Sequence, residues 1–212
     1  MINTLDTLQI NQEFSHLASN DQITRTVQAL EANGVRTTVV ETGEEGREHV
    51  MSLIPVGAQV YNPPSHTVDQ IGLRAAIESS VNFQSLHSRL HSLDRVTQRA
   101  EMRKLISSPD VVIGSVHAVT EMGEVLIASA SGSQLSSIAS GADTVIWVVG
   151  TQKLVSTLEE GFRRIREYSF PLENIRAQQA YGRPSAINKI LIVNGEIPGR
   201  ITMVLVKQNL GF

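Results

Sequence analysis

The sequence predicts an α/β protein with three layers, in which helices cover both faces of a mostly parallel sheet. Runs of apolar and largely β-branched residues, each the length of a buried strand, recur along the chain, and residues 145–149 form the clearest of them. Segments with apolar residues at three- and four-residue spacing separate these runs, and several begin at a capping residue. Strands that alternate with helices of this size usually pair in parallel.

The first half of the chain is predicted to be an arm over residues 1–19 followed by alternating helices and strands. Asn20 or Asp21 can cap the first helix, because Ile23, Val27 and Leu30 then recur on one of its faces. Further helices are expected over 44–53, 67–79 and 94–106, strands over 35–40 and 58–61, and a connecting stretch over 80–93.

The second half of the chain continues the same alternation, so residues 20–212 are predicted to be a single α/β domain. Asn194 and Gly195 favour a tight turn, which would make the last two strands antiparallel. Strands are expected over 110–120, 124–130, 144–149, 189–193 and 200–206, and helices over 134–139, after the capping box at 156–159, and from Pro171 to Gly182.

The composition limits the chemistry that this chain can perform by itself. It has 212 residues, 41% of them hydrophobic, which is enough for a substantial core. The chain contains no cysteine, so it cannot itself hold a cysteine-ligated iron–sulfur cluster, a cysteine zinc site or a thiol nucleophile. Its start lacks the features of a signal peptide and its apolar runs are too short to span a bilayer, so we expect a cytoplasmic protein.

The net charge of −3 is unevenly distributed along the chain. Residues 1–149 carry 9 basic and 16 acidic side chains, whereas residues 150–212 carry 9 and 5. This asymmetry predicts that an anionic ligand would bind near the C-terminal third. Lys153 closely follows the strand expected to end near Gly150 and should therefore reach the carboxyl edge of the sheet, while Arg164 is expected to be a surface charge.

Two hydroxyl-rich loops are candidate anion sites. Ser65 and Thr67 stand where a helix follows a strand, and backbone N–H groups at a helix start can bind a phosphate or carboxylate. Ser131, Gly132 and Ser133 form a loop of small residues after another expected strand, where the backbone can approach an anion closely. An ordinary helix cap and an ordinary tight turn explain the two loops equally simply. The sequence has neither a Walker A lysine loop nor a GxGxxG motif.

Glu121 is the candidate for acid–base or nucleophilic chemistry. It follows an expected strand and precedes a turn at Gly123, so the strand would direct it toward the carboxyl edge, where ligands bind in open α/β sheets. The alternative is a solvated hairpin turn.

Two other clusters are weaker candidates. His87, His91 and Asp94 have helical spacing and could bind zinc, but leucines lie beside that face and Asp94 also suits a helix cap, so no metal site is predicted. Arg95, Arg99 and Arg103 could contact phosphates of a nucleic acid, but this part of the chain is acidic and lacks interleaved aromatic residues. A solvated helix face is the simpler interpretation.

Six segments in the second half of the chain together form a recognisable series of motifs. They are GSVHAVTEMG at 114–123, ASASGSQL at 128–135, VVGTQKLV at 148–155, RRI at 163–165, PLENIRA at 171–177 and LGF at 210–212. In this order they resemble the LUD (lactate-utilisation) domain family in its short stand-alone form, and the resemblance covers residues 57–212. Met122 and Glu124 stand where threonines are common in the family, and Ala130 replaces a frequent asparagine.

The resemblance implies a fold similar to the superfold of ribose-phosphate isomerase, glucosamine-phosphate deaminase and the CoA transferases. In those enzymes a loop rich in serine and threonine holds phosphate, and residues 64–68 are similar to it in the Ser65 and Thr67 positions. A CoA-transferase glutamate before a glycine turn forms a thioester, and Glu121 has a comparable setting. Family members associated with lactate oxidation act beside iron–sulfur and oxidoreductase subunits.

Two functions are therefore considered. The first is an accessory or small-molecule-binding subunit linked to the use of lactate or a related hydroxy acid, with iron–sulfur or oxidoreductase subunits as its partners. The second is an enzyme or sensor for a phosphorylated or CoA-like anion, with Glu121 as base or nucleophile, residues 65, 67, 131–133 and Gly150 as ligand contacts, and Lys153 as the positive charge. Assembly of several copies is compatible with both, nucleic acid is not an expected partner, and the sequence leaves the question of a cofactor open.

Overall fold

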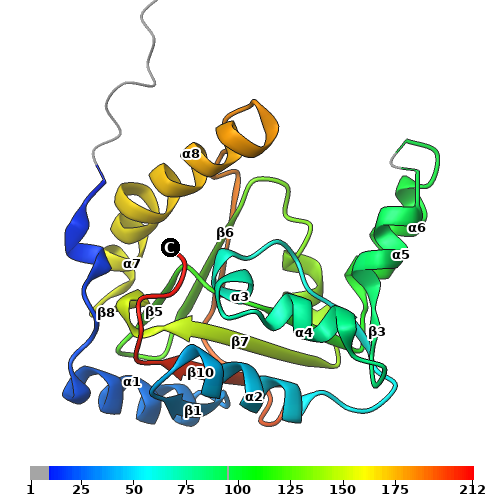
Figure 1. Ribbon diagram of the computed structural model, residues 1–212. Helices are drawn as coiled ribbons and strands as arrows, with labels where there is room; N and C mark the ends of the chain where they lie inside the picture. Colours follow the sequence, from blue (N-terminus) through cyan, green and yellow to red (C-terminus); the bar gives the residue numbers. More distant parts are fainter. Residues whose placement is uncertain (1–9, 95) are drawn as a thin grey trace, which may run out of the picture.

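Six parallel strands form the central sheet of the computed structural model, which describes residues 10–94 and 96–212 (Figure 1). The strand order is β1-β10-β7-β4-β2-β3. In β7 the side chains alternate between two cores, with Trp147 on one face and Ile146 and Val148 on the other. The strands are β1 (Arg36–Val40), β10 (Ile201–Val206), β7 (Thr144–Gly150), β4 (Val111–Gly114), β2 (Gln59–Tyr61) and β3 (Gln84–Ser85).

One face of the central sheet is covered by three helices: α2 (Gly43–Leu53), α3 (His66–Gln70) and α4 (Leu73–Ser79). The hydroxyl of Ser65 caps α3 by accepting a hydrogen bond from the Val68 N–H. A single helix over 67–79 was expected, but Gly72 has a φ of 70° and divides the segment into α3 and α4. This left-handed residue breaks the helical hydrogen-bond pattern.

A second sheet and several helices cover the opposite face. Its four strands have the order β8-β5-β6-β9, with β8 at Leu154–Val155, β5 at Ala118–Thr120, β6 at Val125–Ser129 and β9 at Lys189–Val193. The helices on this side are α1 (Asn20–Ala32), α5 (Leu86–Ser92), α6 (Arg99–Ser107) and the π-helical turn η2 (Ser137–Gly141).

The outer face of the second sheet carries a further layer. The π-helical segment η4 joins α7 to α8, and Phe14 of η1 and Tyr168 of η4 belong to the core beneath this layer. The elements of this layer are η1 (Gln12–Ser15), α7 (Leu158–Arg164), η4 (Ile165–Ser169) and α8 (Phe170–Tyr181).

The predicted α/β class with a mostly parallel sheet is confirmed, but three further local predictions are wrong. The strand expected over 110–120 is two strands, β4 and β5, which lie in different sheets. The expected hairpin of the last two strands does not form, because β9 pairs with β6 while β10 pairs in parallel with β1 and β7. The stretch 80–93, expected to be a connection, contains β3 and α5.

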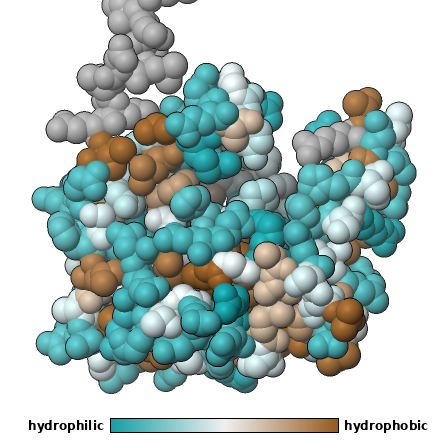
Figure 2. All heavy atoms as spheres, viewed as in Figure 1, coloured by the Kyte–Doolittle hydropathy of each residue, from teal (hydrophilic) through white to brown (hydrophobic). Residues whose placement is uncertain are grey.

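The surface seen in Figure 2 is mostly hydrophilic, and its hydrophobic areas are separated by polar residues, so this view shows no single extended apolar patch. No helix in the described residues is long and apolar enough to cross a membrane. Residues 1–9 of the predicted arm and Arg95 of the predicted basic stripe lie outside the described residues.

Candidate functional site

Two neighbouring strands of the central sheet send the chain into the second sheet at the same edge. After β4, residues 115–117 lead into β5, and after β7 the short 3-10 turn η3 (Thr151–Lys153) leads into β8. Because β4 and β7 are adjacent and parallel, both crossings lie at the carboxyl edge of the central sheet. This is the edge at which open α/β sheets usually bind ligands.

Lys153 connects the two crossings. Its side chain is only 1% exposed, and its Nζ donates to Thr67 Oγ1 at 3.0 Å and to Ser115 Oγ at 3.1 Å. The first hydroxyl belongs to α3 and the second to the crossing after β4. Within the part of the chain that the structure describes, Lys153 has no salt bridge to a carboxylate. A buried amine of this kind carries positive charge only at a considerable desolvation cost.

Arg164 lies behind this lysine and is fully buried, so the prediction that it is a surface charge is wrong. Its guanidinium donates to the His117 carbonyl, to Ser169 Oγ at 2.9 Å and to the Gln152 carbonyl at 3.3 Å. It also lies 5.0 Å from the centre of the Tyr168 ring. Its Nη2 is buried and has no hydrogen-bond partner among the described residues.

Two buried cations, Lys153 and Arg164, and the partly buried His117 lie close enough to influence one another. Burial, followed by the charges of Lys153 and Arg164, lowers the pKa of His117 from 6.5 to about 3. Burial and the Arg164 charge hold the pKa of Lys153 well below its ordinary value, and burial lowers the pKa of Arg164 to about 10. All three shifts disfavour positive charge at these residues, and a negative charge beside them would offset this effect.

The segment that follows β10 covers this site. The Leu210 carbonyl accepts from Thr67 Oγ1 at 3.2 Å and from Gln152 Nε2 at 2.8 Å. Gly150 makes the close approach of this segment possible, since a Cβ there would lie 2.6 Å from the Gln208 carbonyl oxygen. The candidate residues Thr67, Gly150 and Lys153 are therefore brought together under one strap of backbone.

Buried polar atoms without partners concentrate at this edge. Among the described residues, six buried side-chain atoms have no hydrogen-bond partner, and four of them follow β2 or β7 or belong to Arg164. Such atoms are rare in folded proteins and indicate a place where a ligand or water completes the hydrogen bonding. The four are Asn62 Oδ1, Thr151 Oγ1, Gln152 Oε1 and Arg164 Nη2.

The serine loop returns to the same region. It follows β6, whose Ala128 N–H donates to Nδ1 of His117 at 3.1 Å. Burial raises the pKa of the Tyr61 phenol at the end of β2, and the nearby Ser133 offsets part of that rise. Ser131 and Ser133 also bond to each other at 3.1 Å. A Cβ on Gly132 would lie 2.7 Å from Cδ of Lys189, so this glycine allows the lysine stem to cover the loop.

Glu121 occupies a different position. The strand expected to carry it to the carboxyl edge of the central sheet ends at Gly114, and Glu121 follows β5 in the second sheet. It lies at the opposite end of β5 from His117, and its carboxylate pairs with Arg25 of α1 at 2.7 Å. Its catalytic role remains a prediction.

The histidine cluster is held by short-range contacts. His87 Nδ1 lies 2.8 Å from a Glu78 carboxylate oxygen, and the Nε2 atoms of His87 and His91 lie 3.0 Å apart. Asp94 instead accepts the backbone N–H groups of Val96 and Thr97. Within the described ranges, no group of three or more histidine or acidic residues is arranged to hold a metal ion.

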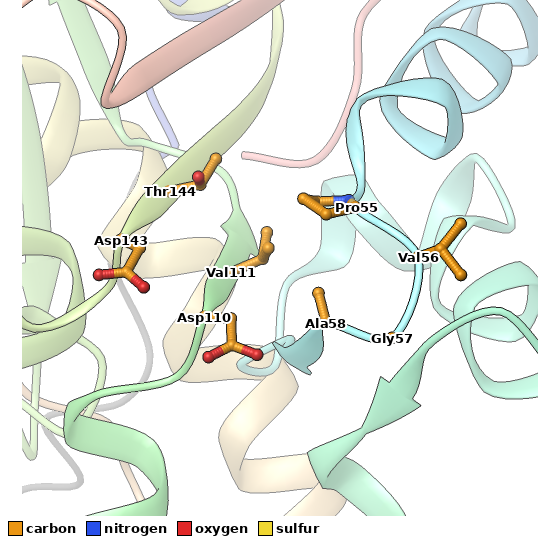
Figure 3. A pocket seen from close by; sticks show the side chains of 8 residues that line it. All are labelled: Pro55, Val56, Gly57, Ala58, Asp110, Val111, Asp143 and Thr144. Atoms are coloured by element: carbon orange, nitrogen blue, oxygen red, sulfur yellow. The ribbon is translucent and has the colours of Figure 1, made fainter.

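A shallow cavity of about 380 Å³ lies at the other end of the central sheet (Figure 3). Asp110 and Asp143 stand beside it, just before β4 and β7, and Pro55 and Val56 form the opposite wall. One carboxylate oxygen of Asp110 accepts the Gln59 N–H at 2.8 Å, which ties β2 to β4. None of the candidate anion-binding residues lines this cavity.

Sequence patterns did not identify Ser115 as a candidate site residue, and they indicated no role for His117. A signal for Ser115 is its position directly after Gly114, where a strand ends. A signal for Arg164 is its place in a helical stripe with Gly161, Ile165 and Tyr168, all of which are buried.

Comparisons with known proteins agree with this architecture. The structure is similar to the crystal structure of a DUF162 family protein from Deinococcus radiodurans, with a TM-score of 0.54 and 14% identity over 90% of this chain and 99% of that chain. A weaker likeness, to eIF2B beta from Chaetomium thermophilum, has a TM-score of 0.33 and 16% identity over 66% of this chain and 47% of that one. No curated protein matches the sequence significantly. The family model described as the LUD domain matches residues 23–207, and the chain therefore belongs to the LUD-domain family.

Proposed function

We propose that this chain binds a small hydroxy-acid anion, of which lactate is the simplest example, at the carboxyl edge of the central sheet. Lys153 and Arg164 would supply the positive charge, and the hydroxyls of Thr67 and Ser115 would orient the ligand. Ser65, at the start of α3, and the serine loop would border the site. In this proposal the chain is an accessory or ligand-binding subunit in the use of such acids.

The observation that carries the proposal is the uncompensated burial of Lys153. Its amine contacts two neutral hydroxyls, and a second buried cation, Arg164, lies close enough to lower its pKa. Burying an ammonium group is unfavourable unless it is paired, so a carboxylate ligand would offset the desolvation penalty at Lys153. The hydroxy-acid class of the ligand is inferred from membership of the LUD-domain family.

The direct test is ligand-induced thermal stabilisation. Wild-type protein is screened against lactate, glycolate, inorganic phosphate and coenzyme A, and a ligand at about 100 times its dissociation constant should stabilise it by about 2.7 kcal/mol. Lys153→Met should abolish the response, whereas Lys207→Met, which alters a lysine paired with Glu41 at the surface, should preserve it. Stabilisation by phosphate or coenzyme A alone would instead favour the phosphorylated or CoA-like ligand class.

The enzymatic alternative depends on Glu121 and is tested separately. Glu121→Gln keeps the shape of the side chain but removes its capacity as a base or thioester-forming nucleophile. If the alternative holds, this variant should lose a turnover or covalent CoA adduct that the wild type shows with the bound ligand. If binding and turnover are unchanged, Glu121 has no chemical role.

The proposed partnership with iron–sulfur or oxidoreductase subunits follows from the family and from the absence of cysteine in this chain. Affinity purification of the tagged full chain from its native cells should recover cysteine-rich redox proteins. Recovery of the chain without any of them would count against an accessory role in oxidation.

A further inference from the structure

Lys153 differs from the other lysines of the chain in its surroundings. The sequence contains four lysines, and the other three are exposed or partly exposed, with Lys207 paired to Glu41. Lys153 alone is buried, and the only hydrogen bonds of its amine within the described residues go to Thr67 and Ser115. Buried lysines in this kind of setting can lose their proton near neutral pH and act as nucleophiles.

The neighbours of Lys153 favour the unprotonated amine. Among residues 10–94 and 96–212, no carboxylate forms a salt bridge with this amine, and the guanidinium of Arg164 disfavours a second positive charge. The imidazole of His117, with its low pKa, is also neutral near neutral pH and adds no compensating negative charge. The same arrangement of a lysine beside another cation activates the amine in enzymes that form Schiff bases.

A second observation identifies the part of a substrate that would bind beside the amine. Arg164 Nη2 is fully buried without a partner, although the other nitrogens of its guanidinium are bonded to protein oxygens. A free guanidinium N–H of this kind is a receptor for a carboxylate. A ligand with an electrophilic carbon next to a carboxylate would suit this pair, with the carbon at the amine of Lys153 and the carboxylate at Arg164.

We propose that Lys153 forms a reversible imine with a 2-oxo acid whose carboxylate is held by Arg164. A 2-oxo acid is the product of oxidising a 2-hydroxy acid, so this inference rests on the proposed function and extends it to the oxidised partner of that ligand. The chain would then hold both members of the pair at one site, the hydroxy acid without a covalent bond and the oxo acid covalently.

The reaction needs no oxidant or reductant. The lone pair of the Lys153 Nζ attacks the ketone carbon, and the electrons of the C=O bond move to oxygen. A proton passes from nitrogen to that oxygen, and the resulting carbinolamine loses water as the C=N bond forms. Thr67 and Ser115, whose hydroxyls already contact Nζ, are placed to carry these protons. Addition of water to the C=N bond reverses every step.

Borohydride trapping tests the imine directly. The wild-type chain is incubated with pyruvate and sodium cyanoborohydride, which reduces the imine to a stable secondary amine, and the modified lysine is located by peptide mass spectrometry. The exposed Lys104 and Lys189 serve as controls within the same molecule. Labelling of Lys153 should exceed theirs by about tenfold or more, because each unit by which a lysine pKa is lowered gives about tenfold more unprotonated amine.

Two variants and a competitor sharpen the test. Lys153→Arg should abolish the main adduct, and Lys207→Arg should leave it unchanged. Arg164→Met should raise the pyruvate concentration needed for half-maximal labelling, since the carboxylate loses its receptor. Lactate has no carbonyl carbon for the amine to attack, so it should form no adduct but should compete with pyruvate.

The outcomes separate this inference from the proposed function. Labelling spread evenly over the exposed lysines, or none at Lys153 in a protein that lactate still stabilises, overturns the imine and leaves hydroxy-acid binding intact. Saturable labelling of Lys153 that lactate does not compete supports the imine and contradicts hydroxy-acid binding. If neither labelling nor stabilisation occurs, both fail.

Discussion

Mild acid should destabilise this protein through one partly buried imidazole, His117. This residue lies in the crossing from β4 to β5, and its Nδ1 accepts the Ala128 N–H at 3.1 Å, so the folded protein holds the ring in the neutral form. Burial, then the charges of Lys153 and Arg164, lowers its pKa from 6.5 to about 3. The unfolded chain has no such environment and binds a proton at His117 below about pH 6.5.

The sign and size of the effect follow from proton linkage. Between pH 6.5 and 3 the unfolded state binds one more proton than the folded state at this residue, so stability falls as the pH falls through this window. Each pKa unit corresponds to about 1.4 kcal/mol, so His117 should remove about 2 kcal/mol of unfolding free energy between pH 7.5 and pH 5. The full difference would approach about 5 kcal/mol near pH 3.

The measurement is urea unfolding at pH 7.5 and pH 5 for wild type and His117→Asn. The asparagine amide oxygen can replace Nδ1 as acceptor of the Ala128 N–H, yet it does not titrate. The variant should lose about 2 kcal/mol less stability than the wild type over this interval. His49→Asn, in α2, is the matched control and should keep the wild-type loss because His117 is still present.

Acidic groups with lowered pKa values, such as Glu167 beside Arg163, are present in all three proteins, and their contribution to the acid loss is common to them. The difference between wild type and His117→Asn therefore reports His117 alone. Equal acid losses for these two proteins would refute the reasoning, because they would mean that His117 has the same pKa folded and unfolded. The buried cationic cluster would then not exist as described.

Three further predictions concern stability. Gly141→Ala places a Cβ 1.7 Å from the Ser107 carbonyl oxygen and should destabilise by about 3 kcal/mol, to be measured by chemical unfolding. Leu30→Ala, at a fully buried position of α1, should lower the unfolding free energy by about 2–5 kcal/mol in the same assay. Arg25→Ala removes the ion pair with Glu121, in which the arginine is half exposed, and its thermal midpoint should reveal a change below about 1 kcal/mol.

Local sequence patterns predicted the bounds of some helices and strands well. The helix expected over 44–53 is observed at Gly43–Leu53, and the strand expected over 144–149 is observed at Thr144–Gly150. Both have strong signals, a capping threonine before the helix and an unbroken apolar run in the strand. The periodicity of side chains therefore carries enough information to place them.

The second sheet could not be predicted in this way. Residues 110–120 are mostly apolar, and the pair Gly114 and Ser115 is a weak signal for the point where the chain leaves one sheet for the other. Likewise Asn194 and Gly195 favour a hairpin locally, but β10 finds partners on both sides in the central sheet. Strand pairing is decided by long-range packing, and here it overrides the local turn signal.

The site was predictable in part for the same reason. Lys153 was placed at the carboxyl edge because it follows a strand, which needs only local information. Ser115 and Arg164 reach it from elements whose arrangement depends on the second sheet, so the sequence alone did not connect them to it. Glu121 is predicted at the same edge only if residues 110–120 form one strand, whereas β4 and β5 lie in different sheets.

Folding stability does not explain why a lysine occupies position 153. An apolar side chain of similar length would fill the same volume without the desolvation penalty, and such replacements of buried charges are often neutral or stabilising. The penalty is not offset by an ion pair within the described residues, and Arg164 increases it. The proposed function supplies a reason for the lysine, because a small anion at the two hydroxyls on Nζ and at Arg164 Nη2, which has no partner among the described residues, would offset this penalty.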